Sequence, residues 1–128
     1  IKALKKFNIN KISIFTPYTK EINDSVVKYF ENENIIINSL SYYDISSDLD
    51  IGKVDRDSLF KVLSKIELDN SDALFVSCTA LPVLSIIDKL EKKLNKIVLS
   101  SNQTLIWDSL NQINFKEKID GFGKLFNS

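Results

Sequence analysis

Residues 73–82 read Ala73-Leu74-Phe75-Val76-Ser77-Cys78-Thr79-Ala80-Leu81-Pro82. The first part of this stretch is continuously apolar, which is typical of a strand buried on both faces of a parallel sheet. The only cysteine of the chain, Cys78, follows that run directly. A helix is predicted from Ala80 to Leu94. The thiol is therefore expected between the carboxyl end of a strand and the N-terminus of a helix. The first N–H groups of a helix favour a thiolate, and this edge of an open α/β sheet is where ligands bind.

Strands and helices alternate along the chain on both sides of that stretch. The runs that predict strands are Lys11–Phe15, Ile35–Leu40, Ala73–Ser77 and Ile97–Leu99. The segments that predict helices are Ile1–Phe7, Lys20–Asn32, a third that ends at Ile66, Ala80–Leu94 and Asn102–Leu110. The third helix is expected to be capped by Asp55 or Asp57. This alternation predicts an α/β fold with a four-stranded parallel sheet and helices on both faces, which is flavodoxin-like. Residues 1–128 fit one such domain.

The composition excludes several classes of function. Lysine plus arginine equals aspartate plus glutamate, at 17 each, so no basic surplus points to nucleic acid or an anionic membrane. The absence of histidine removes Ser-His-Asp, Cys-His and zinc-hydrolase chemistry within this chain, and we expect no metal site. One cysteine cannot form an internal disulfide, and no apolar run approaches the ~20 residues of a membrane span. We therefore expect a reducing, cytoplasmic location.

Polar side chains follow three of the predicted strands. They are Thr16, Tyr18 and Thr19; Ser77, Cys78 and Thr79; and Ser100, Ser101 and Asn102. If the first, third and fourth predicted strands are neighbours, these loops open on the same edge of the sheet. A thiol, a phenol, hydroxyls, an amide and backbone N–H groups suit a small carboxylate substrate held by neutral donors. None of the loops is glycine-rich, so the common nucleotide-phosphate motifs are absent, and Pro17 removes an N–H that a flavin phosphate would need.

Each of these candidates also has a purely structural interpretation. Cys78 could be a small buried hydrophobe, Tyr18 a turn residue at the sheet edge, and Asn102 only the N-cap of the last helix. Two carboxylates, Asp48 and Asp50, are expected to be solvated. Trp107 is expected to be an aromatic residue of the core.

Four ordered segments of the chain form a recognisable set. They are Phe15-Thr16-Pro17-Tyr18-Thr19 followed by a helix with Asn23, Phe75-Val76-Ser77-Cys78-Thr79-Ala80-Leu81 with Leu90-Glu91 one helix later, Ile97-Val98-Leu99-Ser100-Ser101-Asn102-Gln103 before Trp107, and Gly121-Phe122-Gly123-Lys124-Leu125. Together they resemble the second half of the aspartate/glutamate racemase superfamily. Within it, the chain is most similar to the branch of maleate cis-trans isomerases and arylmalonate decarboxylases. The resemblance spans almost the whole chain.

The resemblance implies a cofactor-independent enzyme of two similar, pseudo-symmetric α/β halves with the active site in the cleft between them. Each half typically supplies a cysteine from an equivalent strand end. This chain resembles the C-terminal half, and it opens within a predicted helix without an initiator methionine. We therefore expect it to belong to a longer family-type protein, with a missing N-terminal half-domain or a homo-oligomer partner completing the cleft.

By the same resemblance, Cys78 is the catalytic thiol of the second half. Tyr18 matches a loop tyrosine that donates to a substrate carboxylate, and Thr79 matches a neighbour whose N–H and hydroxyl help to form an oxyanion pocket. The expected substrate-binding set is completed by Thr16, Ala80 and Asn102.

The function implied is an isomerase or racemase of a small dicarboxylic acid or amino acid, similar to maleate isomerase. An arylmalonate-type decarboxylase is an alternative, in which Cys78 alone protonates an enediolate. The sequence Ser77-Cys78-Thr79 disfavours it, because decarboxylases of this group have a Gly-Cys-Gly type of sequence there. The loop Ser101-Asn102-Gln103 differs from that of the best-known maleate isomerases, which leaves the identity of the substrate open.

A non-catalytic receiver- or flavodoxin-like binding module is a third alternative, although receivers need an aspartate where Cys78 stands.

Overall fold

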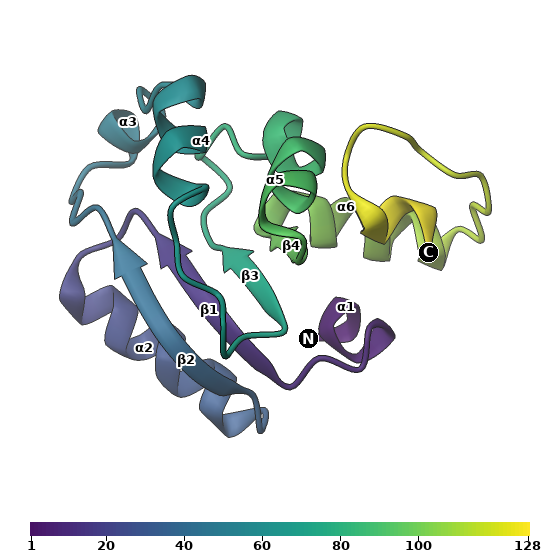
Figure 1. The fold of residues 1–128 in the computed structure, drawn as a ribbon, viewed down its shortest axis with the longest axis horizontal. Helices are drawn as coiled ribbons and strands as arrows, with labels where there is room; N and C mark the ends of the chain where they lie inside the picture. Colours follow the sequence, from purple (N-terminus) through teal and green to yellow (C-terminus); the bar gives the residue numbers. More distant parts are fainter.

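The fold is described from a computed structural model that covers all residues 1–128. A four-stranded sheet lies at its centre, with strand order β2-β1-β3-β4 (Figure 1). The strands are β1 (Lys11–Thr16), β2 (Ile36–Tyr42), β3 (Ala73–Val76) and β4 (Ile97–Ser100). All neighbouring pairs are parallel. The predicted fold class is confirmed, and β1, β3 and β4 are neighbours, as convergence of the three polar loops requires.

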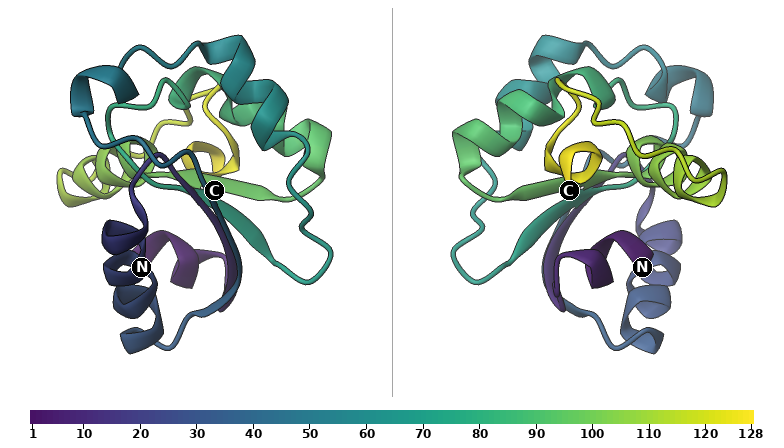
Figure 2. Two further views of the ribbon diagram at one scale, coloured as in Figure 1. Left: turned by 90° about the vertical axis from the view of Figure 1, so that its left-hand side faces the viewer. Right: turned by 90° about the vertical axis from the view of Figure 1, so that its right-hand side faces the viewer.

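Helices cover both faces of the sheet. They are α1 (Lys2–Lys6), α2 (Lys20–Asn32), α3 (Asp48–Ile51), α4 (Arg56–Leu63), α5 (Ile87–Leu94) and α6 (Ser101–Gln112), with short 3-10 turns at Leu84–Ile86 (η1) and Lys124–Asn127 (η2). Figure 2 shows α3 and α4 on one side of the sheet and α1 and α2 on the other. Two buried clusters follow from this arrangement, one between α3–α5 and the sheet and one between α1, α2, η2 and the sheet.

Alternate strand residues feed the two clusters, as the geometry of a strand requires. In β3, Leu74 and Val76 face the α3–α5 side while Ala73 faces the α1–α2 side. All three are fully buried, and burying an aliphatic side chain of the size of valine or leucine stabilises a fold by roughly 1.5–3 kcal/mol. The edge strand β2 differs from the prediction of continuously apolar, buried strands, because Ile36 is 57% exposed at the open side of the sheet.

The helix predicted to begin at Ala80 begins later in the structure. Residues 79–83 form bends and turns, η1 follows, and α5 begins only at Ile87. Pro82 accounts for part of the difference, because the residue before a proline is disfavoured in the helical region, and so Ala80 and Leu81 do not begin the helix. The expectation that Cys78 lies at the N-terminus of a helix is therefore wrong.

The structure shows which residues cap α4 and α6, which the sequence had left open. Asp55, not Asp57, caps α4 by accepting the Ser58 N–H at 2.8 Å. Ser100 caps α6 in a capping box with Gln103, and so the N-cap role considered for Asn102 is wrong. Asn102 lies in the first turn of α6, where its side chain is free to contact another segment.

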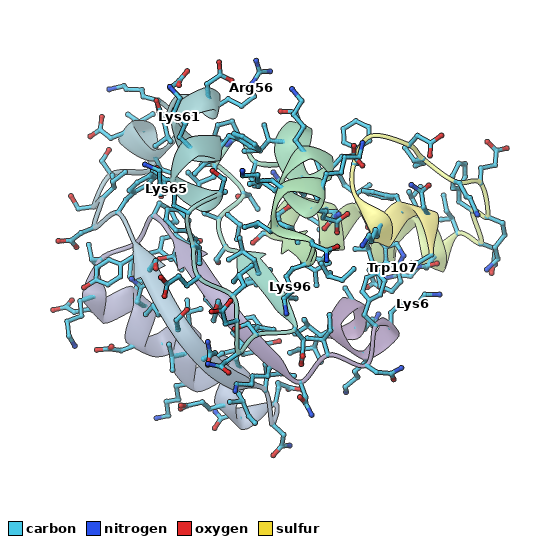
Figure 3. All side chains as sticks on the ribbon, viewed as in Figure 1. Lys6, Arg56, Lys61, Lys65, Lys96 and Trp107 are labelled. Atoms are coloured by element: carbon cyan, nitrogen blue, oxygen red, sulfur yellow. The ribbon has the colours of Figure 1, made fainter.

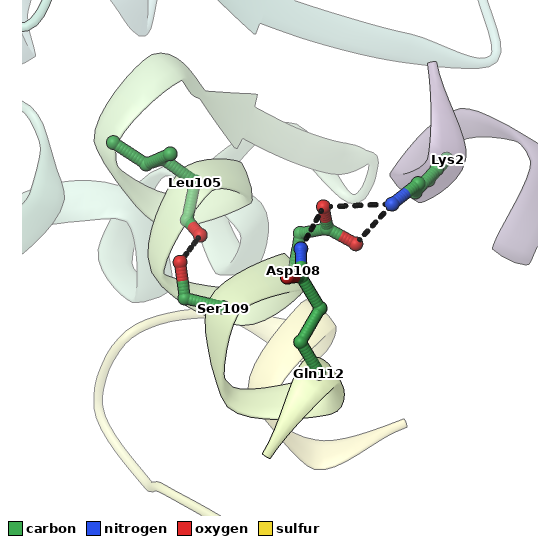
Figure 4. A network of polar contacts seen from close by, with 5 residues as sticks. All are labelled: Lys2, Leu105, Asp108, Ser109 and Gln112. Carbon is green, nitrogen blue, oxygen red and sulfur yellow. Dashed lines mark hydrogen bonds and ion pairs between the residues drawn. The ribbon is translucent and has the colours of Figure 1, made fainter. Parts of the chain in front are cut away.

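An ion pair ties the first helix to the last. Lys2 Nζ lies 2.8 Å from both carboxylate oxygens of Asp108, which also accepts from Gln112 (Figure 4). The Lys2 side chain is 67% exposed, so we assign this pair little stability. Trp107, on the same helix, packs partly buried against the α1–α2 cluster, which confirms the core interpretation. No helix of the fold is long and apolar enough to cross a membrane.

The C-terminal segment is held by a buried carboxylate. Glu91 on α5 is only 4% exposed and accepts the N–H groups of Val98 at 3.1 Å and Lys124 at 2.8 Å. Burial raises the pKa of Glu91, and the two N–H donors oppose that rise. Gln103 adds a hydrogen bond to the Phe122 carbonyl at 2.7 Å. Side chains of α5 and α6 therefore hold the returning chain on the sheet.

Gly123 offers a test of this closure. Its φ is +89°, and an added Cβ would lie 2.5 Å from Ile87 Cγ2 and 2.9 Å from Gln103 Nε2. We expect Gly123→Ala to lower the free energy of unfolding by about 2–4 kcal/mol, from the strained φ and overpacking together. Gly121→Ala is the matched control, since Gly121 has φ +88° and no atom within 4 Å of an added Cβ. Its cost should be about 1 kcal/mol, and equal costs in urea denaturation would contradict the close approach.

Candidate active site

The register of the sheet brings three loops to one edge. Phe15 lies opposite Val76, and Val76 lies opposite Ser100. The residues that follow these positions therefore emerge side by side at the carboxyl ends of β1, β3 and β4. This edge is where open α/β sheets bind ligands.

Cys78 lies two residues beyond β3 in an unusual backbone conformation. Its φ is +102°, a left-handed value that residues with a side chain adopt at a cost of about 1–2 kcal/mol. The side chain is 7% exposed, and its Sγ accepts the Ala80 N–H at 3.4 Å. One backbone N–H from the loop thus contacts the sulfur, in place of the helix terminus predicted from the sequence.

The first turn of α6 holds the loop that carries Cys78. Ser101 Oγ accepts the Cys78 N–H at 3.1 Å, and Asn102 Nδ2 donates to the Thr79 carbonyl at 2.9 Å. Both contacts link residues 23 positions apart in the sequence. They satisfy backbone groups on either side of the Cys78–Thr79 peptide and so stabilise the strained conformation.

Tyr18 brings a phenol to the same place from the β1 loop. Its side chain lies near those of Ser77 and Cys78, both of which influence its pKa. Burial raises the pKa of Tyr18, the contact with Cys78 and the charge of Asp48 raise it further, and the Ser77 contact opposes them. Because the pKa lies above its ordinary value of 10, Tyr18 is protonated at neutral pH and can donate a hydrogen bond.

A buried Thr16–Asn23 pair fixes the backbone of Tyr18. The Thr16 hydroxyl donates to Asn23 Oδ1 and accepts the Tyr18 N–H at 3.2 Å. Asn23 Nδ2 donates to the Tyr18 carbonyl at 3.1 Å. Both polar side chains are almost fully buried and fully used. Thr16 therefore acts on the site through Tyr18, since its hydroxyl already has protein partners.

The segment that follows β2 supports that loop from the other side. Tyr43 N–H donates to the Thr16 carbonyl at 3.1 Å, and Ile45 N–H donates to the Pro17 carbonyl at 2.8 Å. The Tyr43 ring packs edge-on against Phe15, with ring centroids 5.0 Å apart. The β1 loop is thus held at several points before any ligand arrives.

Two hollows are lined by residues that adjoin Cys78 in the sequence. One, of about 340 Å³, includes Thr79, Ala80, Asn102 and Phe122 in its lining. The other, of about 350 Å³, is almost wholly apolar and is lined by Ile22, Ser25, Val26, Tyr29, Phe30, Phe75 and Ser77. Thr79 and Ala80 are exposed at the first hollow, although the Thr79 carbonyl and the Ala80 N–H already have partners within the protein.

The predicted site residues thus lie at one edge of the sheet, but in two groups. Tyr18 lies near Cys78, while Asn102 donates a hydrogen bond to the Thr79 carbonyl beside them. The residues assembled here include no cation. Figure 3 labels the cations Arg56 and Lys61, which lie on α4, and Lys65, which follows that helix. No group of three His, Cys, Asp or Glu side chains is placed to hold a metal ion.

Asn23 and Asp48 contribute to this arrangement but were not assigned a site role from the sequence, whereas Ser77 and Ser101 were expected at this edge only as general hydroxyl donors. A buried asparagine four residues into the α2 segment, after Thr-Pro-Tyr, is a local signal that could have been used. The Ser101 contact depends on the β3–β4 register, and no local pattern indicates it.

Comparison with known proteins identifies the family. The family model described as arylmalonate decarboxylase matches residues 1–126.

The chain belongs to the arylmalonate decarboxylase family.

Named relatives within this family have two activities. The chain is 26% identical over 128 residues to the maleate isomerase of Alcaligenes faecalis, covering 99% of this chain and 51% of that protein. It is 22% identical to the arylmalonate decarboxylase of Bordetella bronchiseptica, covering 99% of this chain and 54% of that protein. The chain therefore spans about half the length of the curated relatives it matches.

Solved structures of the family share the fold. The maleate isomerase Iso from Pseudomonas putida S16 matches with a TM-score of 0.92 at 24% identity, over 98% of this chain and 51% of that chain. Arylmalonate decarboxylase matches with a TM-score of 0.87 at 22% identity, over 98% of this chain and 57% of that chain. Half of a family-type structure thus superimposes on nearly all of this chain.

The left-handed conformation of this family member's cysteine gives a stability prediction. Glycine adopts a positive φ freely, whereas alanine does not. We expect Cys78→Gly to be more stable than Cys78→Ala by about 1 kcal/mol, although ordinary positions favour alanine over glycine. Urea denaturation of the two variants measures the difference. A Cys78→Ala variant as stable as Cys78→Gly would contradict a strained backbone at this residue.

Proposed function

We propose that this chain forms half of the active site of a cofactor-independent isomerase or racemase, of the maleate cis-trans isomerase type, with Cys78 as its catalytic thiol. The observation that carries the proposal is the placement of Cys78. A residue poorly suited to a positive φ is held there, its sulfur accepts a backbone N–H, and a protonated phenol lies nearby. Strain that the surrounding structure maintains is typical of functional sites.

A solved relative supports covalent cysteine chemistry in an enzyme of this fold. A cysteine-to-serine mutant of the Nocardia farcinica maleate cis-trans isomerase was solved with a covalently bound succinylcysteine intermediate, which a different cysteine of that enzyme therefore carries, and its fold matches this chain with a TM-score of 0.92. A succinyl group on sulfur is a four-carbon dicarboxylate joined through a C–S bond. Thiolate addition to the double bond of maleate forms such a bond.

We derive the proposed reaction from the groups at this edge. The Cys78 thiolate adds to one alkene carbon, and the electron pair of the double bond moves onto the neighbouring carbon and its carboxylate. The remaining C–C single bond rotates, and the pair then returns to expel the thiolate and give fumarate. Tyr18 donates to the carboxylate where charge develops, the exposed Thr79 lies at the adjoining hollow, and the Ala80 N–H contacts the sulfur itself. Atoms and charge are conserved overall, so the cycle requires no cofactor.

The partner we propose is a second half-domain of the same fold. The relatives are about twice as long as this chain, which supports a cleft formed by two halves. The apolar hollow beside Ser77 leaves Ile22 49% exposed and Tyr29 56% exposed, as expected of a face that another body covers. A second copy of this chain is the other occupant to consider. The reducing cytoplasm is the location we propose, since the reaction requires a free thiol.

Decarboxylation of a malonate-type acid is the second candidate, favoured by the family model that matches the chain. In that reaction a carboxylate leaves as CO₂, and the Cys78 thiol delivers a proton to the enediolate that remains. One thiol suffices, so this activity does not require a second cysteine across the cleft.

Proton NMR in D₂O tests the catalytic role of Cys78 and separates the candidates. Maleate, aspartate, glutamate and phenylmalonate are each incubated with the native protein and with Cys78→Ala. We expect maleate conversion to fumarate, or deuterium uptake at the α-carbon of an amino acid, that depends on Cys78. Turnover that persists in Cys78→Ala would overturn the proposal, and Cys78-dependent loss of CO₂ from phenylmalonate would favour the decarboxylase. If the native chain alone shows no turnover, adding the second half-domain should produce turnover.

Tyr18→Phe tests the proposed carboxylate donor. Loss of one hydrogen bond to a charged group should lower kcat/KM about 10- to 100-fold. Tyr43→Phe is the matched control, because Tyr43 is a half-buried tyrosine of the adjoining strand segment whose ring packs on Phe15. It should leave kcat/KM within about 2-fold of the native value. Because the pKa of Tyr18 lies above 10, the ratio of native to Tyr18→Phe activity should stay constant from about pH 7 to 9. A ratio that collapses in this range would contradict a protonated donor.

A further inference from the structure

The first turn of α6 carries two side chains that contact the Cys78 loop and not the helix itself. Ser101 Oγ accepts the Cys78 N–H at 3.1 Å, and Asn102 Nδ2 donates to the Thr79 carbonyl at 2.9 Å. The Thr79 carbonyl belongs to the peptide whose N–H, that of Ala80, donates to Cys78 Sγ at 3.4 Å. The Asn102 contact therefore fixes the plane of the peptide that contacts the sulfur.

Neither side chain is needed to begin the helix. Ser100 and Gln103 form the capping box of α6, each accepting a backbone N–H of the other. Thr104 donates to the carbonyls of Ser100 and Ser101. With the helix start already satisfied, the Ser101 hydroxyl and the Asn102 amide have another role.

We propose that Ser101 and Asn102 are positioning residues for the reaction of Cys78. Ser101 holds the left-handed backbone of Cys78, and Asn102 orients the Thr79–Ala80 peptide so that its N–H meets Sγ. The catalytic part of this inference rests on the proposed function, whereas the conformational part concerns only the contacts of the chain itself. It also gives Asn102 a role different from the substrate contact predicted from the sequence.

Three variants and one control separate this role from simple support of the fold. Ser101→Ala removes the acceptor and introduces the best helix former. Ser101→Thr restores the hydroxyl. Asn102→Asp keeps the shape but replaces the amide donor by a carboxylate, which the first turn of a helix favours. Thr104→Val is the matched control, because its hydroxyl lies in the same turn and contacts only helix carbonyls. All four variants are therefore expected to fold.

The first measurement uses the ¹⁵N-labelled chain without substrate. Ser101→Ala should accelerate hydrogen exchange of the Cys78 amide about 10-fold, because one hydrogen bond is lost. The HN–Hα coupling of Cys78, which reports its φ, should change in the same variant. Ser101→Thr and Thr104→Val should both keep the native exchange rate and coupling. Unchanged exchange in Ser101→Ala, or an equal acceleration in Thr104→Val, would overturn the positioning of Cys78 by Ser101.

The second measurement is turnover of maleate by the assembled enzyme. Ser101→Ala and Asn102→Asp should each lower kcat about 10-fold or more with KM within about 2-fold, since the reacting sulfur is misplaced while binding groups stay. Ser101→Thr should recover most of the lost kcat. A higher KM with native kcat in Asn102→Asp would assign Asn102 to substrate binding and overturn its positioning role.

The two measurements keep this inference distinct from the proposed function. If Cys78→Ala retains turnover, the proposed function fails and with it the catalytic part of the inference. The exchange and coupling data on the free chain then still decide whether Ser101 holds the Cys78 backbone.

Discussion

The hydrogen bond between the Cys78 N–H and the Ser101 hydroxyl joins the carboxyl ends of β3 and β4 at the point where the backbone is most strained. A left-handed residue with a side chain persists only where its surroundings favour that conformation over relaxed alternatives. The sheet supplies those surroundings, because Val76 and Ser100 are paired in register and the residues beyond them emerge side by side. The orientation of the thiol therefore depends on strand pairing, and through it on the two apolar clusters that hold the sheet.

The same edge carries an unusual concentration of buried polar groups, each of which must find a partner. Thr16 and Asn23 satisfy each other and both backbone groups of Tyr18. Ser100 and Gln103 satisfy each other and the start of α6. An unpaired buried donor or acceptor costs about 1–3 kcal/mol, so these closed sets allow little alternative geometry. The consequence is a site whose loops are ordered by the protein itself, before a ligand contributes.

The parallel fold could be predicted from the sequence because strands that are buried on both faces consist of continuous apolar residues. The position of Cys78 beyond its strand was predictable for the same reason. The start of the next helix was not placed correctly, although Pro82 carried the necessary signal. The Ser101 contact could not be predicted, since it joins residues 23 positions apart and depends on a register that the sequence pattern does not specify. Local propensity thus indicated the elements, and long-range pairing decided the site.

The geometry of the half-site links closure of the cleft to the chemistry of the thiol. Ser77 lines the apolar hollow between α2 and β3, and both Ser77 and Cys78 lie near the Tyr18 side chain. A body that covers the exposed Ile22 and Tyr29 in this hollow therefore removes water from the immediate neighbourhood of the reacting groups. Hydrogen bonds from fixed donors strengthen as the local dielectric falls. If a second half-domain covers this face, as we propose, then burial of the apolar face and removal of water from the donors around Cys78 are one event.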